Sequence, residues 1–304
     1  MAPRLGLGGG LTADPASGLF GAPNLLLDNY PGAHRAYSVR KLSKDYSGFA
    51  MKVRENTSTN NYTADVGFDD DGRVSASSPL SNKSAGSAAG DTLGAWATAG
   101  SYNTIQCTTW YDQSGEGVNA VQTSPTLQPI IYSSGLNTEG DPARAALLFD
   151  GSNDAMAIDE AGLSLGSVTV FAVFKNLNAS SSQTPWFLSS GVGNYFGHFK
   201  ATTDQYWYDA GSVSSATANT DQKLFSYKGA SGSQILFVNG SAGTNSGSSV
   251  DTSSFTDATS NGLGTFGGFF NWQGEFQEFI VYDSDQESNR TNIESDITTE
   301  FGIS

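Results

Sequence analysis

The sequence predicts an all-β protein, built as a two-sheet antiparallel sandwich with one C-terminal helix and an extended N-terminal arm. Charged residues make up 15% of the 304 residues, below the ~25% of ordinary soluble domains. The 36 glycines and long Ser, Thr and Asn stretches separate short apolar runs, which is typical of many turns joining short strands. A hydrophobic content of 38% is enough for one large domain.

The arm is predicted over residues 1–28, and a single sandwich over residues 29–304. The arm is rich in Gly, Ala, Pro and Leu and shows neither a strand period nor a helix period. Its segments LGLGGGL and GLFGAPNLLL are too apolar for a solvated tail. We therefore expect the arm to pack against another surface.

Strand-like runs recur between turn signals along the rest of the chain, which divides into a front part (29–140) and a second part (141–304). The run SVTVFAVFK, residues 167–175, is apolar on both faces of a strand, so we expect it to lie between two layers. A small, polar stretch over 75–92 predicts a long loop. The other runs lie at 35–42, 50–55, 63–68, 106–112, 128–133, 144–150, 184–190, 195–201, 205–210, 223–229, 234–240 and 274–283.

Only the C-terminus shows a helical pattern. Ser284 and Glu287 fit a capping box, and Gly302 fits a C-terminal stop. Between them, apolar residues recur at four-residue steps, at Ile293, Ile297 and Phe301. This single stripe predicts a helix that docks on the sandwich.

The charge balance excludes several partners. Lys and Arg total 15 against 30 Asp and Glu, a formal net charge of −15, so nucleic acid and anionic membrane surfaces are not expected to bind. No run reaches the ~18 apolar residues of a spanning helix, and no apolar segment of a secretory signal is found. Cys107 is the single cysteine, and its alternating surroundings favour a small buried residue over a nucleophile.

The strand sequences carry a family resemblance. The segments ALLFDGSNDAMAI, SLGSVTVFAVFK, ILFVNGSAG and GEFQEFIVYDSDQESNRTNIESDITTEFGI resemble concanavalin A-like (laminin-G-type) jelly-roll sandwiches over roughly residues 145–303. The front segments AYSVRKL, MKVRE, VGFDDDG and TTWYDQSGEGVNAVQT are similar to the start of the α-L-arabinofuranosidase B catalytic domain. The same combination is frequent in bacteriophage structural proteins. The resemblance implies a lectin-like fold.

The segment WYDQSGEG, residues 110–117, has two interpretations. Asp112 and Ser114 can accept from nearby backbone amides and the glycines can adopt positive φ, so a self-capped turn explains the segment without chemistry. Alternatively Trp110, Tyr111, Asp112 and Gln113 contact a sugar, through flat apolar faces and acceptors. Aromatic residues beside Gly/Ser/Asn loops, above all Trp207 and Trp272, are further candidates for such contacts.

Hydrolysis would require two carboxyl groups flanking the scissile bond. Glu278 is the candidate general acid because it shares a strand face with Phe276, Ile280 and Tyr282. Its alternative role is a buried carboxylate bound to Arg or to backbone. Strict alternation places Glu275 on the opposite face, so the two are not expected to pair. The arabinofuranosidase family has an adjacent cysteine pair and an acidic motif that this chain lacks, so no catalytic residue is carried over.

Two acidic loops offer oxygen ligands, and one stretch is basic. Asp69 and Asp71, and Asp150 and Asp154, could hold calcium or simply cap their own turns; no other cofactor is expected. Six of the 15 basic residues lie within twenty positions, which predicts internal ion pairs or an acidic assembly partner. They are Arg35, Arg40, Lys41, Lys44, Lys52 and Arg54.

The resemblance and the missing signal favour a phage virion protein, assembled in the host cytoplasm and displayed on tail or capsid. We expect its sandwich to bind host surface polysaccharide and its arm to contact other virion proteins. A homo-oligomer is expected, so that weak sugar sites act through avidity. The alternatives are a glycoside hydrolase of the arabinofuranosidase type and a non-binding capsid decoration or cement protein.

Overall fold

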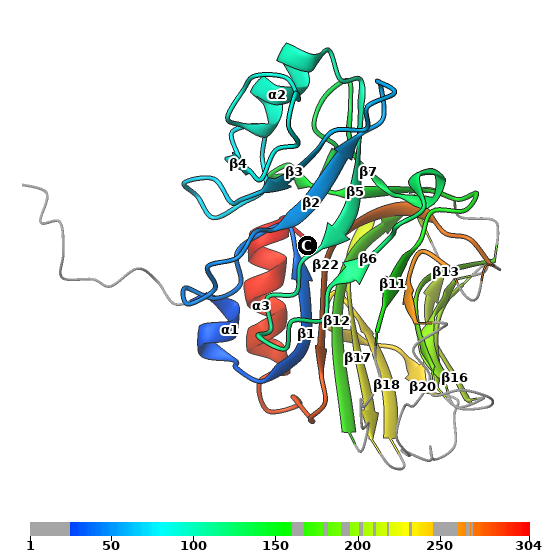
Figure 1. Cartoon of the computed structure of the whole chain (residues 1–304). Coiled ribbons are helices and arrows are strands. Elements are labelled where there is room, and N and C mark those ends of the chain that lie inside the picture. The colour runs from blue at the N-terminus through cyan, green and yellow to red at the C-terminus, as the bar shows by residue number, and fades with distance from the viewer. Residues whose placement is uncertain are drawn as a thin grey trace, which may run out of the picture.

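The computed structural model in Figure 1 describes residues 25–159, 167–178, 182–189, 195–200, 203–208, 211–217, 219–230, 233–245, 261–265, 268 and 270–304. Antiparallel strands dominate it and form two facing layers, so the predicted all-β sandwich is confirmed. Most of the predicted arm, residues 1–24, lies outside the described residues.

The first layer is centred on two ten-residue strands, β12 (Ser167–Asn176) and β22 (Gln273–Tyr282), which pair with one another. One edge continues through β17 (Gln222–Ala230), β18 (Ser233–Val238) and β19 (Ser241–Ala242). The other edge of β22 pairs with both β1 (Ala33–Ser38) and β10 (Leu147–Asp150). Nearly all of β12 is buried, as its two apolar faces predict.

The second layer faces the first, on the right of Figure 1. It includes β6 (Ala120–Val121), β11 (Met156–Ile158), β21 (Gly262–Leu263), β13 (Gln183–Ser189), β14 (Tyr195–Lys200), β15 (Thr203–Tyr208), β16 (Gly211–Thr217) and β20 (Thr244–Asn245). Buried aromatic rings fill the space between the layers: Trp186 lies 5.4 Å from Phe279 and His198 lies 5.1 Å from Phe174, centroid to centroid. Such tilted and edge-on contacts are those that aromatic pairs prefer.

The front part of the chain extends the sheet upward in Figure 1. Its elements in this extension include β2 (Met51–Glu55), β3 (Thr63–Val66), β4 (Leu80–Ser81), β5 (Thr104–Trp110), a short 3-10 helix (Pro125–Leu127) and β7 (Ile130–Ser133). The hairpin of β8 (Thr138–Glu139) and β9 (Arg144–Ala145) follows them in the chain. β5 connects this part to the sandwich because it pairs with β2, β6 and β7. The predicted 75–92 loop is confirmed except for β4.

The C-terminal helix α3 lies on the outer side of the first layer and contacts β17 (Figure 1). It spans Arg290–Phe301, its apolar stripe is buried, and Gly302 ends it with φ 65°, as predicted. The predicted capping box is wrong, because the helix begins after Asn289 and no side chain caps it. Residues 284–286 instead form an irregular segment and residues 287–289 a turn, and the backbone amide of Gln286 donates to the Thr169 hydroxyl at 3.0 Å.

Two α-helices were not predicted. α1 (Leu26–Asn29) lies at the end of the predicted arm and buries Leu26 and Leu27 in the core. α2 (Leu93–Gly100) buries only Leu93, Trp96 and Ala97, so its Gly- and Ala-rich sequence carries almost no apolar stripe. None of the helices in the described part of the chain has the length and apolar character needed to cross a membrane.

Candidate functional site

The turn that follows β5 binds the edge of β1 with its side chains. We call Asp112, Gln113 and Ser114 the DQS turn. The Asp112 carboxylate accepts hydrogen bonds from the backbone amides of Ala36 and Ser114, both at 2.9 Å. The backbone amide of Gln113 donates to the Ala36 carbonyl at 2.8 Å. The turn thus supplies the donor and the acceptor that a neighbouring strand would offer to Ala36.

The Gln113 side chain extends this role to the segment after β1. Its Nε2 donates to the carbonyls of Ser38 and Arg40 at 3.3 and 2.9 Å, and its Oε1 accepts the Leu42 amide at 2.9 Å. Asp112 and Gln113 are 5% and 3% exposed. The self-capped turn of the sequence analysis therefore also holds β1 in place, and the polar atoms of these two side chains face the protein interior.

The predicted tryptophan contacts require correction. Trp110 and Trp272 are fully buried, and their indole N–H groups donate to the Ser38 carbonyl (3.2 Å) and to Asn176 Oδ1 (2.8 Å). Both rings belong to the core and offer no face to a sugar. The Trp207 side chain lies outside the described residues. Among the predicted residues whose side chains the structure describes, Tyr111 is half-buried and lies at the surface.

A hollow of about 250 Å³ opens directly beside the DQS turn. α1 and the start of β1 supply apolar walls, and the loop after β1 supplies hydroxyl and carboxylate groups. This second wall could not be predicted from the sequence, because it is a short loop without a recognisable motif. The lining residues are Leu27, Pro31, Gly32, Ala33, Ser43, Asp45, Tyr46, Gln113, Ser114 and Gly115.

Half-buried aromatic rings continue from the hollow along the neighbouring surface. We call Tyr46, Phe49, Phe68 and Tyr111 the aromatic ridge. The rings of Tyr46 and Phe68 lie 6.4 Å apart, as do those of Phe49 and Tyr111, and the Tyr46 hydroxyl donates to the Phe49 carbonyl at 2.8 Å. Tyr46 lines the hollow as well, so the hollow and the ridge form one surface.

Both phenols of this surface are neutral hydrogen-bonding groups at physiological pH. Burial, and then the nearby Asp112 carboxylate, raises the pKa of Tyr46 to about 12. Burial, and then the hydrogen bond to Asp65, also raises the pKa of Tyr111; this bond from the Tyr111 hydroxyl to Asp65 Oδ1 is 2.7 Å long. The site therefore combines apolar faces with hydroxyl and carboxylate groups.

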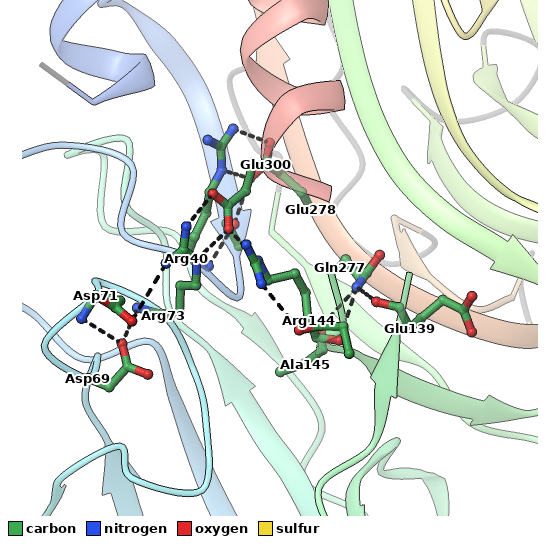
Figure 2. A network of polar contacts seen from close by, with 12 residues as sticks. Arg40, Asp69, Asp71, Arg73, Glu139, Arg144, Ala145, Gln277, Glu278 and Glu300 are labelled. Atoms are coloured by element: carbon green, nitrogen blue, oxygen red, sulfur yellow. Dashed lines mark hydrogen bonds and ion pairs between the residues drawn. The ribbon is translucent and has the colours of Figure 1, made fainter. Parts of the chain in front are cut away.

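Glu278, the predicted general acid, lies in a polar network behind α3 (Figure 2). It is fully buried, and Arg40 donates to both of its oxygens, from Nε at 2.8 Å and from Nη2 at 3.0 Å, while the Ser38 hydroxyl donates at 2.7 Å. Arg40 also binds Asp296 at 2.7 Å. Burial alone would lower the pKa of Arg40, but these carboxylates raise it above its usual value. These contacts are the ones expected of a buried carboxylate bound to Arg, the alternative role considered for Glu278.

The same network fixes the end of α3. Glu300 accepts from Arg73 at 2.6 Å and from Arg144 at 2.7 Å. Burial would raise the pKa of Glu300, but the two guanidinium groups hold it below its usual value. Of the basic stretch, Arg40 is paired internally, as expected, whereas the buried Arg54 binds the neutral side-chain oxygens of Gln128 and Gln106.

A β-bulge changes the predicted relation between Glu275 and Glu278. Register shifts within β22, so that Glu275 lies opposite Lys175 and Glu278 opposite Val173. Residues 173 and 175 share one face of β12, so both glutamates point to the same face, and the predicted opposition is wrong. They still do not pair with one another. Glu275 binds Glu139, which accepts from Lys175 at 2.8 Å.

The Glu139–Glu275 pair is the feature that sequence analysis could not find, because its members are far apart in the chain. Burial, and then the neighbouring Glu139, raises the pKa of Glu275 to about 7. The pKa of Glu139 is lowered instead. Burial alone would raise the pKa of Glu139, but the hydrogen bonds from Lys175 and Glu275 lower it by more. The two carboxyl groups therefore share a proton near neutral pH.

The acidic loops cap their own turns. Asp69 accepts the amides of Asp71 and Arg73 at 3.0 and 2.9 Å, and Asp150 accepts that of Ser152 at 2.7 Å. Burial, and then Asp150, raises the pKa of Asp154 to about 7. Within the described residues no group of three or more His, Cys, Asp or Glu is placed to hold a metal. Calcium binding stays a prediction.

No protein-family model matches the sequence, and no curated protein shows significant similarity to it. Solved structures do match. An arabinofuranosidase complexed with arabinofuranosyl-α-1,2-xylobiose superposes with a TM-score of 0.55 at 16% identity, over 88% of this chain and 63% of that chain. A GH54 α-L-arabinofuranosidase soaked with a cyclic sulfate inhibitor gives 0.55 at 15% identity over the same shares.

The likeness is one of fold. This chain spans about 63% of the length of those arabinofuranosidases, and the identity is too low to carry residues across. The similarity of the chain to an arabinofuranosidase sandwich, expected from its front segments, is confirmed at the level of architecture.

Proposed function

We propose that this protein binds carbohydrate at the hollow and the aromatic ridge. The observation that carries the proposal is their continuity: Tyr46 belongs to both, and polar groups of Ser43, Asp45 and Ser114 line the hollow at its side. A sugar presents apolar C–H faces and a rim of hydroxyl groups. Aromatic rings beside hydroxyl and carboxylate acceptors match both features.

The fold supports the same proposal. Its solved neighbours include an arabinofuranosidase complexed with an arabinofuranosyl-xylobiose, so the sandwich is one on which carbohydrate chemistry is built. Fold alone does not fix function, and the proposal therefore depends on the hollow.

Binding can be tested by calorimetric titration with neutral tetrasaccharides of arabinan, xylan and cellulose. We expect at least one to bind, and Asp45→Ala to weaken that affinity about 3- to 10-fold through lost hydrogen bonds. The matched control is Asp91→Ala, which removes a carboxylate that is 99% exposed beside Lys83 and away from the hollow. Absence of binding to a broad glycan array would contradict the proposal and favour a decoration or cement protein.

We further propose that the binding is adhesive, with display on a phage particle and multivalent attachment to host polysaccharide. The support for this finer role is the resemblance of the front and sandwich segments to phage structural proteins. Labelled antibodies against the protein should decorate intact particles of a phage that encodes it. Particles without label would remove the virion role and leave carbohydrate binding untouched.

A glycoside hydrolase of the arabinofuranosidase type is the second candidate, favoured by the neighbour that aligns with 88% of the chain. A retaining enzyme needs two carboxyl groups ~5 Å apart with the sugar between them, whereas Glu139 and Glu275 bind one another directly. Release of nitrophenol from an aryl arabinofuranoside, abolished by Glu275→Gln in a folded protein, would establish hydrolysis. No turnover would leave binding as the function.

A further inference from the structure

The ridge extends the proposed sugar site well beyond the hollow. Tyr46 contacts the Phe68 ring on one side and the Phe49 carbonyl on another, and Phe49 continues to Tyr111. Tyr111 in turn is held by Asp65, which also accepts from Asn82. The rings are thus fixed by their neighbours and offer a preformed surface.

The hollow itself is small. Its volume of about 250 Å³ lies below the ~300–1,000 Å³ of pockets that enclose a drug-sized ligand. It has room for a single sugar unit and not for several. Any further units of a bound chain must therefore lie outside it, and the aromatic surface next to it is the ridge.

The charges around the site favour an uncharged chain. Asp45 lines the hollow, the Asp112 carboxylate lies close enough to perturb Tyr46, and Asp65 holds Tyr111. The whole chain carries a formal charge of −15. These carboxylates and the overall field repel polyanionic glycans such as polyuronates and sulfated chains.

We propose that the site binds a neutral oligosaccharide chain of at least three units, with one unit in the hollow and the following units over the aromatic ridge. This inference rests on the proposed carbohydrate binding and adds the ligand class and its placement. It predicts that affinity grows with chain length, because each additional unit covers another ring.

The test compares a monosaccharide with its neutral tetrasaccharide by calorimetric titration, in the wild type and in Phe49→Ala. The wild type should bind the tetrasaccharide at least tenfold more tightly than the monosaccharide. Removing the Phe49 ring should reduce this ratio about 3- to 10-fold. Far-UV circular dichroism checks that each variant is folded, and Tyr132→Ala, which removes a half-buried ring outside the hollow and the ridge, should retain the wild-type ratio.

The outcomes separate this inference from the proposed function. Equal affinity for both sugars, or an unchanged ratio in a folded Phe49→Ala, would overturn the extended site while carbohydrate binding stands. Tighter binding of a polyuronate tetramer than of the neutral one would overturn the charge argument. Absence of binding by any sugar would overturn both.

Discussion

Replacement of Glu278 by Ala tests whether this carboxylate is structural. The change removes the two Glu278 oxygens, on β22, that accept from Arg40. The Arg40 side chain, which is 11% exposed, keeps Asp296 as its remaining carboxylate partner. It also removes the acceptor of the Ser38 hydroxyl. Breaking one partner of a buried ion pair costs about 3–5 kcal/mol, since a desolvated charge is left behind. We expect the free energy of unfolding to fall by that amount.

The measurement is urea unfolding followed by tryptophan fluorescence and circular dichroism. The control is Asp71→Ala, which removes an 82% exposed carboxylate 4.0 Å from Arg73 and should change the free energy by less than about 0.5 kcal/mol. The structural role of Glu278 would be refuted if Glu278→Ala unfolded at the wild-type urea concentration, and above all if it lost a hydrolytic activity while staying equally stable.

The buried groups of Asp112, Glu275 and Cys107 lead to expectations for stability, for its pH dependence and for thiol reactivity. Asp112→Ala removes the acceptor of three backbone amides, those of Ala36, Ser114 and Val118. The free energy of unfolding should therefore fall by about 3–5 kcal/mol. A loss below about 0.5 kcal/mol would show that the DQS turn does not hold β1. Glu275 has a pKa of about 7 in the folded chain against 4.5 ordinarily, so the folded state binds the proton more tightly than the unfolded state does. This difference contributes to the free energy of unfolding, and the contribution is fully present in acid. That contribution, up to about 3 kcal/mol, is lost as pH rises from about 4.5 to 7; Glu275→Gln should flatten the pH dependence of unfolding, and an unaltered slope would count against the shared proton. Burial raises the pKa of the Cys107 thiol, so it should react with a disulfide reagent only after denaturation; reaction within minutes in the native protein would contradict its burial.

The strands and the docking of α3 could be predicted from the sequence because each depends on a local apolar pattern. The two apolar faces of residues 167–175 correctly predicted that both faces of β12 are buried, and the stripe through Ile293, Ile297 and Phe301 correctly predicted the buried face of α3. Periodicity reports which side chains are buried in a regular element.

Irregular geometry could not be predicted. The bulge in β22 adds one residue between Glu275 and Glu278 and turns both to one face, against the strict alternation that the sequence analysis assumed. α2 has almost no apolar stripe, so its existence depends on the Thr92 cap and on the packing of Trp96. Neither feature has a period that a sequence window detects.

The candidate site likewise has one part that could be predicted from the sequence and one part that could not. The turn chemistry of Asp112 and Ser114 was predicted from residue types, since Asx and Ser side chains bind nearby amides. The hollow brings together three segments near residues 27–33, 43–46 and 113–115, and only the last carried a recognisable motif. Trp110 appeared suited to sugar stacking, yet its position at the end of β5 places it in the core.

We propose that the hollow and the aromatic ridge together bind neutral carbohydrate. The most direct test is a titration of ¹⁵N-labelled protein with a neutral tetrasaccharide, followed by amide chemical shifts. We expect saturable shifts at the hollow, at Ser43, Tyr46, Ser114 and Gly115, and at the ridge, at Phe68 and Tyr111. A spectrum that does not change with any sugar, or shifts confined to other parts of the protein, would contradict it.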